Sequence, residues 1–263
     1  MISRTLLAWM RIRVLEDICC PRCGGELDGE FDRIVDEFVI SGELRCARCG
    51  EAYPIIRGIP RMSFKVRMNV SERLWRILYN IYAPFYDRVE AWAAERLGFR
   101  EEELRENVVK RLRLRGGEKI LEICIGTGGN LPYLSRYNPS AIYGIDFSEK
   151  MLEVCLKRLR KLTLRNVELF IGLAEYLPFK AGLFDAILNL GGITYFTEKK
   201  RAIEEMFRVA RRGARIVICE QITLLEKLLG KAEPPISLIP EKSSPSLEYI
   251  YGGRFYVIEA TKT

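Results

Sequence analysis

The sequence predicts an α/β protein with a doubly wound, mostly parallel sheet of seven strands and a small four-cysteine unit in front of it. Short apolar segments alternate with helical patterns from residue 119 onward, and the first segment runs directly into glycines. Two Cys-x-x-Cys pairs near the N-terminus predict the small unit. We expect three parts: an N-terminal helix and zinc ribbon over 1–64, a connector with cofactor-covering helices over 65–115, and the main domain over 116–263.

The composition is that of a globular protein. Of the 263 residues, 48% are hydrophobic and 29% are charged, and the formal net charge is +7. This charge is compatible with an RNA partner and equally with plain solubility. No apolar run reaches the roughly 18 residues of a membrane span, and Arg11 and Arg13 interrupt the N-terminal run too early for a secretory signal. We therefore expect a cytoplasmic protein without a membrane span.

Histidine is absent from the chain, which limits the chemistry available to it. A metal site must then use cysteine or carboxylate ligands. A general base must be a carboxylate, tyrosine, lysine or cysteine.

The N-terminal segment begins with a helical pattern and continues into the cysteines. Apolar residues within Thr5–Leu15 have the spacing of a short packing helix. Two cysteine pairs follow, with 22 residues between them. They have the spacing of a closed tetrahedral zinc site, and disulfides are the alternative that a reducing compartment disfavours. Cys19 is the unused neighbour, and segments 31–35 and 38–44 read as strands of the ribbon. The predicted ligands are Cys20, Cys23, Cys46 and Cys49.

Two stretches of this segment carry a family resemblance. CPRCGGEL and the segment YPIIRGIP at Tyr53–Pro60 resemble the small zinc-ribbon proteins that activate eukaryotic and archaeal methyltransferases. The resemblance covers about residues 13–62. It implies a partner subunit fused to another domain.

The connector is helical and charged from Ser71 to Leu114, with breaks at Pro84 and Gly98. The aromatic segment Tyr79–Asp87 reads as a helix that packs on the main domain. A second, amphipathic helix is predicted over Glu101–Leu114.

The main domain alternates strands with helices in the expected order. Ser148 is predicted to cap the helix that carries residues 151–162. Thr197 is predicted to cap a second helix, which runs to about Arg211. The proline- and serine-rich segment 234–246 is predicted to be a loop or a lid over the site. The predicted strands are 121–125, 141–145, 167–171, 184–189, 214–220 and a closing hairpin of 247–251 with 254–260.

The glycine-rich turn after the first strand has the spacing of a nucleotide-binding loop. Cys124, Gly126 and Gly129 occupy the positions of the dinucleotide fingerprint, and Asp146 lies 20 residues after Gly126. Glu122 argues against a dinucleotide, because a pyrophosphate would come close to this carboxylate. S-adenosylmethionine instead presents a sulfonium and an ammonium group, which a carboxylate attracts. The residues therefore favour S-adenosylmethionine.

Four ordered motifs then resemble one family. LEICIGTGGNLPYL, IYGIDFSEKMLEVC, NVELFIGLAEYLPFKAGLFDAIL and RVARRGARIVICE are similar to the motifs of class I S-adenosylmethionine-dependent methyltransferases, which have a Rossmann-like fold. The branch with the ubiquinone and menaquinone C-methyltransferases is the most similar. The match runs from about Tyr79 to the C-terminus.

The resemblance implies a cofactor site with specific roles. Glu122, Gly126, Thr127, Gly128 and Asn130 would surround the methionine and ribose end, and Asp146 would hold the ribose hydroxyls. The remaining predicted contacts are Phe147 and Met151 beside the adenine, Ala174 and Glu175 at its edge, Asn189 and Leu190 near the methyl group, and Tyr79 and Tyr86 over the cofactor.

Two positions depart from the family pattern. Cys124 replaces the first glycine of the loop, and cysteine is tolerated there if the backbone needs no positive φ. Leu173 replaces an acidic residue and removes one acceptor for the adenine amine. These departures keep a binding-only protein open as an alternative.

The methyl acceptor stays open among three hypotheses, and no catalytic base is identified. The segment after Asn189 lacks the Asn/Asp-Pro-Pro-Tyr motif of many exocyclic-amine methyltransferases, and Tyr195 is either a substrate contact or a core aromatic. The ribbon captures RNA, or it stabilises a small-molecule or quinone-like methyltransferase, or it docks a protein partner. The first hypothesis needs a basic face made of Arg22, Arg45, Arg48, Arg57, Arg61, Lys65 and Arg67.

Overall fold

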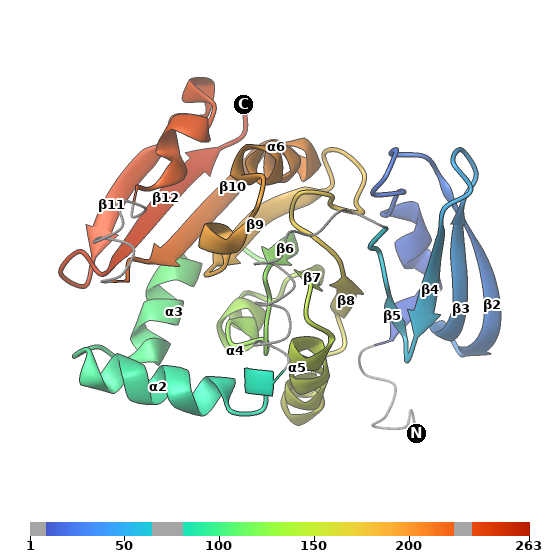
Figure 1. Ribbon diagram of the computed structural model, residues 1–263, viewed down its shortest axis with the longest axis horizontal. Helices are drawn as coiled ribbons and strands as arrows, with labels where there is room; N and C mark the ends of the chain where they lie inside the picture. Colours follow the sequence, from blue (N-terminus) through green and yellow to red (C-terminus); the bar gives the residue numbers. More distant parts are fainter. Residues whose placement is uncertain (1–8, 65–80, 224–232) are drawn as a thin grey trace.

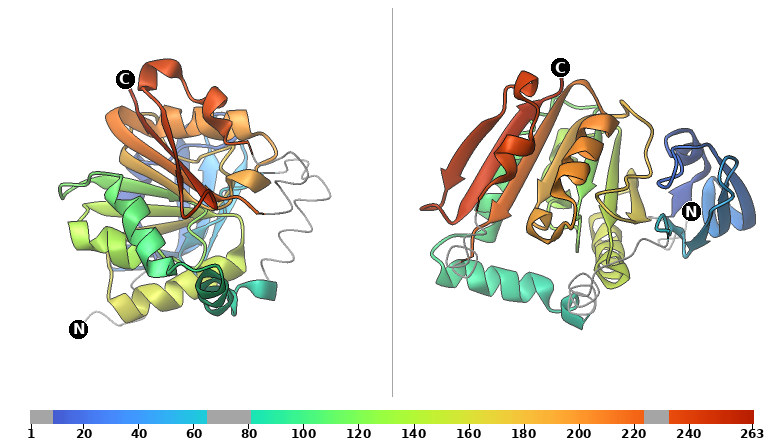
Figure 2. Two further views of the ribbon diagram at one scale, coloured as in Figure 1. Left: turned by 90° about the vertical axis from the view of Figure 1, so that its left-hand side faces the viewer. Right: turned by 45° about the horizontal axis from the view of Figure 1, so that its top comes forward.

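The computed structural model describes residues 9–64, 81–223 and 233–263. It shows a small antiparallel β-sheet unit beside a larger α/β domain (Figure 1). We call residues 9–64 the ribbon. The two units touch along one edge of the larger sheet, and the right view of Figure 2 shows the ribbon beside that edge.

The ribbon is a five-stranded antiparallel sheet. Its strands follow the order β1-β3-β4-β5, and β2 pairs with the free side of β3. The elements are β1 (Met10–Arg11), the 3₁₀ turn η1 (Ile12–Glu16), β2 (Leu27–Val35), β3 (Phe38–Cys46), β4 (Ala52–Ile56) and β5 (Ile59–Pro60).

The helix predicted over Thr5–Leu15 is wrong at Met10–Arg11, which form a strand, and only the 3₁₀ helix Ile12–Glu16 is helical among the described residues of this segment. Met10 and Arg11 pair with Val39 and Phe38 of β3, and a single 3₁₀ turn follows. The pairing satisfies the backbone of this segment and buries Met10, which outweighs a weak helical pattern.

The larger sheet has seven strands in the order β11-β12-β10-β9-β6-β7-β8. The five strands from β10 to β8 are parallel, and β12 and β11 close the sheet as an antiparallel hairpin. This confirms the predicted doubly wound sheet. The strands are β6 (Lys119–Ile123), β7 (Ala141–Asp146), β8 (Val167–Ile171), β9 (Phe184–Leu190), β10 (Ala210–Gln221), β11 (Ser246–Ile250) and β12 (Phe255–Thr261).

Helices cover both faces of this sheet. Apolar side chains of α6 pack on one face in the same cluster as the apolar residues of the ribbon, and those of α3, α4 and α5 pack on the other. The α-helices are α2 (Tyr86–Arg96), α3 (Glu101–Lys110), α4 (Leu131–Leu134), α5 (Glu149–Leu162) and α6 (Lys199–Val209). The short 3₁₀ helices are η2 (Ser135–Tyr137), η3 (Ile193–Tyr195), η4 (Pro235–Leu238) and η5 (Glu241–Ser243).

One predicted helix cap is confirmed and the other is wrong. Ser148 caps α5, where its hydroxyl accepts a hydrogen bond from the amide of Met151 at 3.2 Å. Helix α6 begins only at Lys199 with Glu198 at the cap position, and the amide of Thr197 donates to Glu175 instead. The helix also ends at Val209, because Ala210 already pairs with β9.

The ribbon docks on the exposed edge of the main sheet at β8. The amide of Met62 donates to the carbonyl of Ile171 at 2.7 Å, and Arg61 bridges Ile171 in parallel register. Further along, the amide of Cys19 donates to the carbonyl of Pro178 at 3.0 Å. An open sheet edge is a surface that other chains can pair with, and here the ribbon covers it.

Candidate cofactor site and metal centre

A cavity of about 670 Å³ lies at the carboxyl ends of the parallel strands. This edge of a doubly wound sheet is where ligands bind. Helices α2 and α3 supply its cover through residues such as Tyr86 and Leu104, and β6, β7 and β9 supply its floor. The segment 234–246, predicted as a loop or a lid, contributes no residue to the lining, and its 3₁₀ turn η4 packs against α6.

Asp146 fixes the glycine-rich loop at the floor of the cavity. Its two carboxylate oxygens accept hydrogen bonds from the amides of Gly126 at 2.9 Å and Ser148 at 2.8 Å. Burial raises the pKa of this carboxyl to about 6, although the amide donors oppose the shift. The carboxylate thus joins the ends of β6 and β7 at the cavity surface.

Two buried acceptor atoms beneath the loop have no hydrogen-bond partner among the described residues. They are Oε2 of Glu122 and Oδ1 of Asn189. The other oxygen of Glu122 accepts from the side-chain amide of Asn130 at 2.7 Å. Burial raises the pKa of Glu122 to about 7. Unsatisfied buried acceptors are costly, and a cationic ligand group would satisfy them. The site therefore fits S-adenosylmethionine on the chemistry of its own residues.

The predicted site residues divide into two layers. Eight of them line the cavity: Tyr86, Gly126, Asp146, Phe147, Met151, Ala174, Glu175 and Leu190. Five are buried outside the lining: Glu122, Thr127, Gly128, Asn130 and Asn189. The remaining residue, Tyr79, lies outside the described part of the chain.

The buried residues of the loop hold its shape and connect it to the covering helices. The Thr127 hydroxyl donates to Asp87 of α2 at 2.6 Å, and Arg158 of α5 pairs with the same carboxylate at 2.5 Å. Gly128 has a φ of +76°, and a Cβ there would lie 2.6 Å from Leu131 and 2.8 Å from Cys155. Only glycine fits that position without displacing its neighbours.

Cys124 has a left-handed backbone, with a φ of +58°. Cysteine is expected to be tolerated here only if the backbone needs no positive φ. The structure does not meet this condition. Its side chain lies against the loop after β9, where a Cβ on Gly192 would come within 2.8 Å of the sulfur. Burial raises the pKa of Cys124 well above its usual value, so this side chain is a thiol and not a nucleophilic thiolate.

Sequence reasoning missed several charged residues of the cavity. Arg105 on α3 lines it, as do Glu90, Glu101 and Glu220. The signal for Arg105 was the Glu101 and Arg105 pair at helical i,i+4 spacing, which is usually a solvated surface pair. Here the pair faces inward, because Leu104 and Val108 anchor the helix on the sheet.

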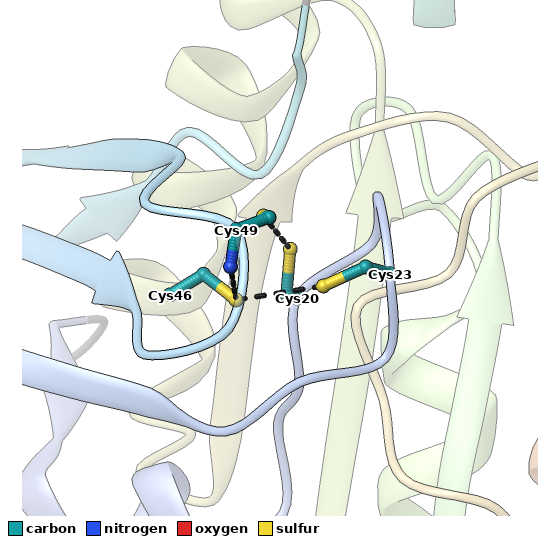
Figure 3. Close-up of side chains that lie close together, drawn as sticks. All are labelled: Cys20, Cys23, Cys46 and Cys49. Carbon is teal, nitrogen blue, oxygen red and sulfur yellow. Dashed lines mark hydrogen bonds between the residues drawn. The ribbon is translucent and has the colours of Figure 1, made fainter.

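The four predicted zinc ligands come together in the ribbon (Figure 3). Their sulfur atoms all lie within 4.8 Å of one another, with Cys20 and Cys49 at 3.7 Å and Cys23 and Cys46 at 3.5 Å. Zinc–sulfur bonds of about 2.3 Å in a tetrahedron place neighbouring sulfurs about 3.8 Å apart. The thiols are not joined as disulfides, and their arrangement fits a structural zinc ion.

The surroundings of this cluster are also those of a metal centre. The buried Tyr53 hydroxyl lies 3.0 Å from the sulfur of Cys20, and the amide of Cys49 donates to Cys46 at 3.4 Å. A Cβ on Gly25 would lie 2.9 Å from the sulfur of Cys46. Hydrogen bonds to thiolates stabilise their charge and orient them toward a metal. Cys19 stands apart from the cluster, as predicted.

The basic face predicted for RNA binding is largely neutralised. Arg22 pairs with Glu51 at 2.6 Å, Arg61 pairs with Glu149, and Arg45 pairs with Glu43. Residues 9–64 hold eight arginines, no lysine and ten carboxylates, so the formal charge of the ribbon is −2 with neutral cysteines. Lys65 and Arg67 lie outside the described residues. The positive charge of the protein therefore resides elsewhere.

The strand order, the acid at the end of β7 and the glycine loop define the S-adenosylmethionine-dependent methyltransferase fold. Residues 120–213 match the methyltransferase domain family, and residues 11–58 match the Trm112p-like protein family. Each match covers less than half of the chain, and the two matches fall in the two units of the structure.

Curated relatives are similar to part of the chain. A demethylmenaquinone methyltransferase of Geobacillus sp. is 31% identical over 57% of this chain and 63% of its own length. A ubiquinone/menaquinone biosynthesis C-methyltransferase of Wigglesworthia glossinidia brevipalpis is 32% identical over 53% of this chain and 56% of its own length. The chain thus spans less than two thirds of these relatives.

Solved structures share the fold. A candidate S-adenosyl-L-methionine-dependent methyltransferase of Methanococcus maripaludis superposes with a TM-score of 0.56 at 19% identity, over 70% of this chain and 93% of that one. A chain from the complex between the Haloferax volcanii Trm112 methyltransferase activator and a candidate methyltransferase gives 0.53 at 10% identity, over 70% and 98%.

Among the described residues, no helix has the length and apolar character needed to cross a membrane.

Proposed function

We propose that this protein is an S-adenosylmethionine-dependent methyltransferase that acts on a small, largely apolar acceptor, with the zinc ribbon serving as a permanently attached subunit. The observation that carries the proposal is the cavity at the carboxyl ends of β6, β7 and β9, whose lining combines carboxylates and glycines with apolar side chains. The carboxylates suit a cationic cofactor, and the apolar side chains suit the acceptor.

The charge of the cavity supports a cationic cofactor. Among the described lining residues are five carboxylates, Glu90, Glu101, Asp146, Glu175 and Glu220, and a single cation, Arg105. A dinucleotide would bring two phosphate charges into this acidic surface, whereas S-adenosylmethionine brings a sulfonium and an ammonium group. The buried acceptor atoms of Glu122 and Asn189 that have no hydrogen-bond partner among the described residues also favour a cationic cofactor.

The shape of the cavity supports a small apolar acceptor. Its lining extends from Asp146 on β7 to Phe255 on β12, which are four strand positions apart in the sheet, or about 19 Å. At the β12 end, Phe99 packs edge-on against Phe255 with ring centroids 5.3 Å apart. Leu97 and Phe85 extend this apolar wall. Two relatives act on quinone precursors by name, which agrees with such an acceptor.

Catalysis here needs little beyond positioning. S-adenosylmethionine, when bound, would supply an activated methyl group for transfer to the acceptor. The chain contributes a covered cavity in which α2 and α3 exclude water and hold the two reactants in line. Glu220 lies at the end of β10 on the cavity surface, where a carboxylate can take up the proton that the acceptor loses.

We assign the ribbon a structural role in cis, with one zinc ion held by its four cysteines. Its apolar residues Met10, Val14 and Ile18 belong to the same cluster as Tyr143 and Phe170 of the main sheet. The Trm112 methyltransferase activator in the Haloferax volcanii complex is a separate protein, whereas this chain carries a similar domain on its own sheet edge.

The test is methyl transfer from labelled S-adenosylmethionine by the purified full-length protein. Total RNA, a lipid and quinone extract, and a protein extract are offered separately. We expect label in the lipid and quinone fraction, and none with an Asp146→Ala variant as the control. Label in RNA or protein alone would overturn the acceptor class. If calorimetry detects no binding of S-adenosylmethionine to the purified protein, the enzyme proposal falls.

A further inference from the structure

The cation of the cavity has a specific task that the motifs do not assign. We propose that Arg105 recognises the α-carboxylate of the cofactor's methionine moiety, so that Arg105 and Glu122 together read its amino-acid end as a zwitterion. This inference rests on the proposed function. It makes Arg105 a determinant of cofactor specificity contributed by the covering helix α3.

The first support is the chain of hydrogen bonds that links Arg105 to the central carboxylate. Nη1 of Arg105 donates to Oδ1 of Asn130 at 3.0 Å, and Nδ2 of Asn130 donates to Oε1 of Glu122 at 2.7 Å. The side-chain amide of Asn130 therefore lies between the guanidinium of Arg105 and the carboxylate of Glu122. The ammonium and carboxylate of an α-amino acid are likewise held close together by one carbon.

The second support is that Arg105 is fixed in place and still has donors left. Its Nε and Nη2 atoms donate to Oε1 of Glu101, with the Nε bond at 2.9 Å, and its side chain is only 12% exposed. A guanidinium carries five N–H donors in a rigid plane, and these three bonds leave two. A carboxylate suits the remaining donors, because guanidinium and carboxylate groups match in geometry.

The third support is the packing of Arg105 on the glycine loop. A Cβ on Gly129 would lie 2.5 Å from the guanidinium carbon and 2.7 Å from Nη1 of Arg105. Gly129 has an ordinary φ, so its glycine is not needed for backbone conformation. Its lack of a side chain instead lets Arg105 lie directly against the loop. Gly129, which matches a glycine of the nucleotide-binding pattern, thus leaves room for the guanidinium of Arg105.

The fourth support is electrostatic. Of the described residues that line the cavity, five are acids and Arg105 alone is a cation. The carboxylate of the cofactor would meet repulsion from Glu90, Glu101 or Glu175 at other places on this surface. Arg105 is the one described lining residue that turns this contact into an attraction.

The test compares two ligands on matched variants by calorimetry. S-adenosylmethionine is measured beside decarboxylated S-adenosylmethionine, which keeps the sulfonium and the amine but lacks the carboxylate. We expect the wild-type protein to prefer the first by about 10- to 100-fold, the range of a charge-assisted hydrogen-bond pair. Arg105→Met should reduce this preference to less than about threefold, and Arg105→Lys should retain part of it.

Arg111→Met is the control, because Arg111 follows the same helix, is 16% exposed and pairs with Glu248 and Glu259 without lining the cavity. It should leave the preference unchanged. A purely structural Arg105 would weaken both ligands equally, and that result overturns the proposal, as does a wild type without preference. Should Arg105→Met fail to fold, the Lys variant decides on the same ratio. A wild type that binds neither ligand overturns the proposed function itself.

Discussion

Cys124 shows how one residue of the loop departs from its family at an energetic cost. Its φ of +58° is a conformation that disfavours side chains by roughly 1–2 kcal/mol. The thiol fills space beside Gly192 and offsets part of that cost. The substitution therefore alters the local backbone strain and the shape of the cavity lining.

Two substitutions at Cys124 separate these effects. Cys124→Ala loses the thiol contacts and keeps the left-handed strain, whereas Cys124→Gly loses the contacts and relieves the strain. We expect the glycine variant to be more stable than the alanine variant by about 1 kcal/mol in chemical denaturation. At a position with ordinary φ, alanine would be the more stable of the two, so the reverse order would contradict the assigned backbone.

Cofactor binding should depend on pH through Glu122 and Asp146. Burial raises their pKa values to about 7 and about 6. A proton on either group removes a negative charge that attracts the cationic cofactor, so affinity is full above pH 7 and falls as the pH drops below it. We expect calorimetric affinity for S-adenosylmethionine to be roughly 10- to 30-fold weaker at pH 5.5 than at pH 8.

The same two groups act on stability with the opposite sign. Their pKa values in the folded protein lie above the ordinary values of 4.5 and 3.8, so the unfolded chain loses these protons first. Their contribution to the stability of the unliganded protein therefore decreases as pH rises from about 4 to 7. Glu122→Gln should flatten the upper part of the binding profile; an unchanged profile would exclude Glu122 as the titrating group.

At the scale of elements, the junction of ribbon and β8 is the most informative contact. Arg11 of β1 pairs with Glu168 of β8 at 2.5 Å, and their side chains are 8% and 2% exposed. On the same side, Lys119 of β6 pairs with Asp17 at 2.8 Å. Edge strands usually protect themselves with solvated charge, whereas the buried Glu168 depends on a cation from the ribbon.

Breaking this buried pair should destabilise the whole protein. Arg11→Met leaves an uncompensated buried carboxylate, which costs about 3–5 kcal/mol. The double variant Arg11→Met with Glu168→Gln should recover part of that loss in chemical denaturation. Arg22→Met removes an exposed pair with Glu51 and serves as the control, at less than about 1 kcal/mol. Equal costs for the two arginines would contradict a buried, obligatory junction.

At the scale of the molecule, the ribbon and the catalytic domain share one apolar core. Cys20 and Cys46 belong to the same cluster as Leu121 and Ile187, the strand residues next to the cofactor site. Loss of metal from the ribbon should therefore also destabilise the seven-stranded sheet. Structural zinc contributes directly to folding free energy, so a zinc ion bound in the ribbon would also stabilise the α/β domain that shares its core.

We expect one zinc ion per chain by elemental analysis and a single cooperative thermal transition. Cys49→Ser or a strong chelator should remove the zinc and lower the Tm of that whole transition. Cys219→Ser changes a buried cysteine outside the cluster and is the control, which should keep its zinc. Two separate transitions, with the second unaffected by chelation, would show that the domains are energetically independent.

The sequence alone determined the doubly wound, mostly parallel sheet of seven strands and the four-cysteine cluster. These features follow from local patterns: β-branched runs such as Val167–Ile171, caps such as Ser148, and paired cysteines at fixed spacing. It also predicted the acids at the carboxyl ends of β6 and β7, because parallel strands end at one edge.

Only the tertiary structure decided which charges face each other. Arg105 reads as a surface residue until α3 is packed on the sheet, and the ribbon arginines read as a basic face until their carboxylate partners are in place. The backbone of Cys124 and the pairing of Arg11 with Glu168 are likewise set by contacts distant in sequence. Charge pairing and backbone strain depend on separation in space, which local patterns in the sequence do not specify.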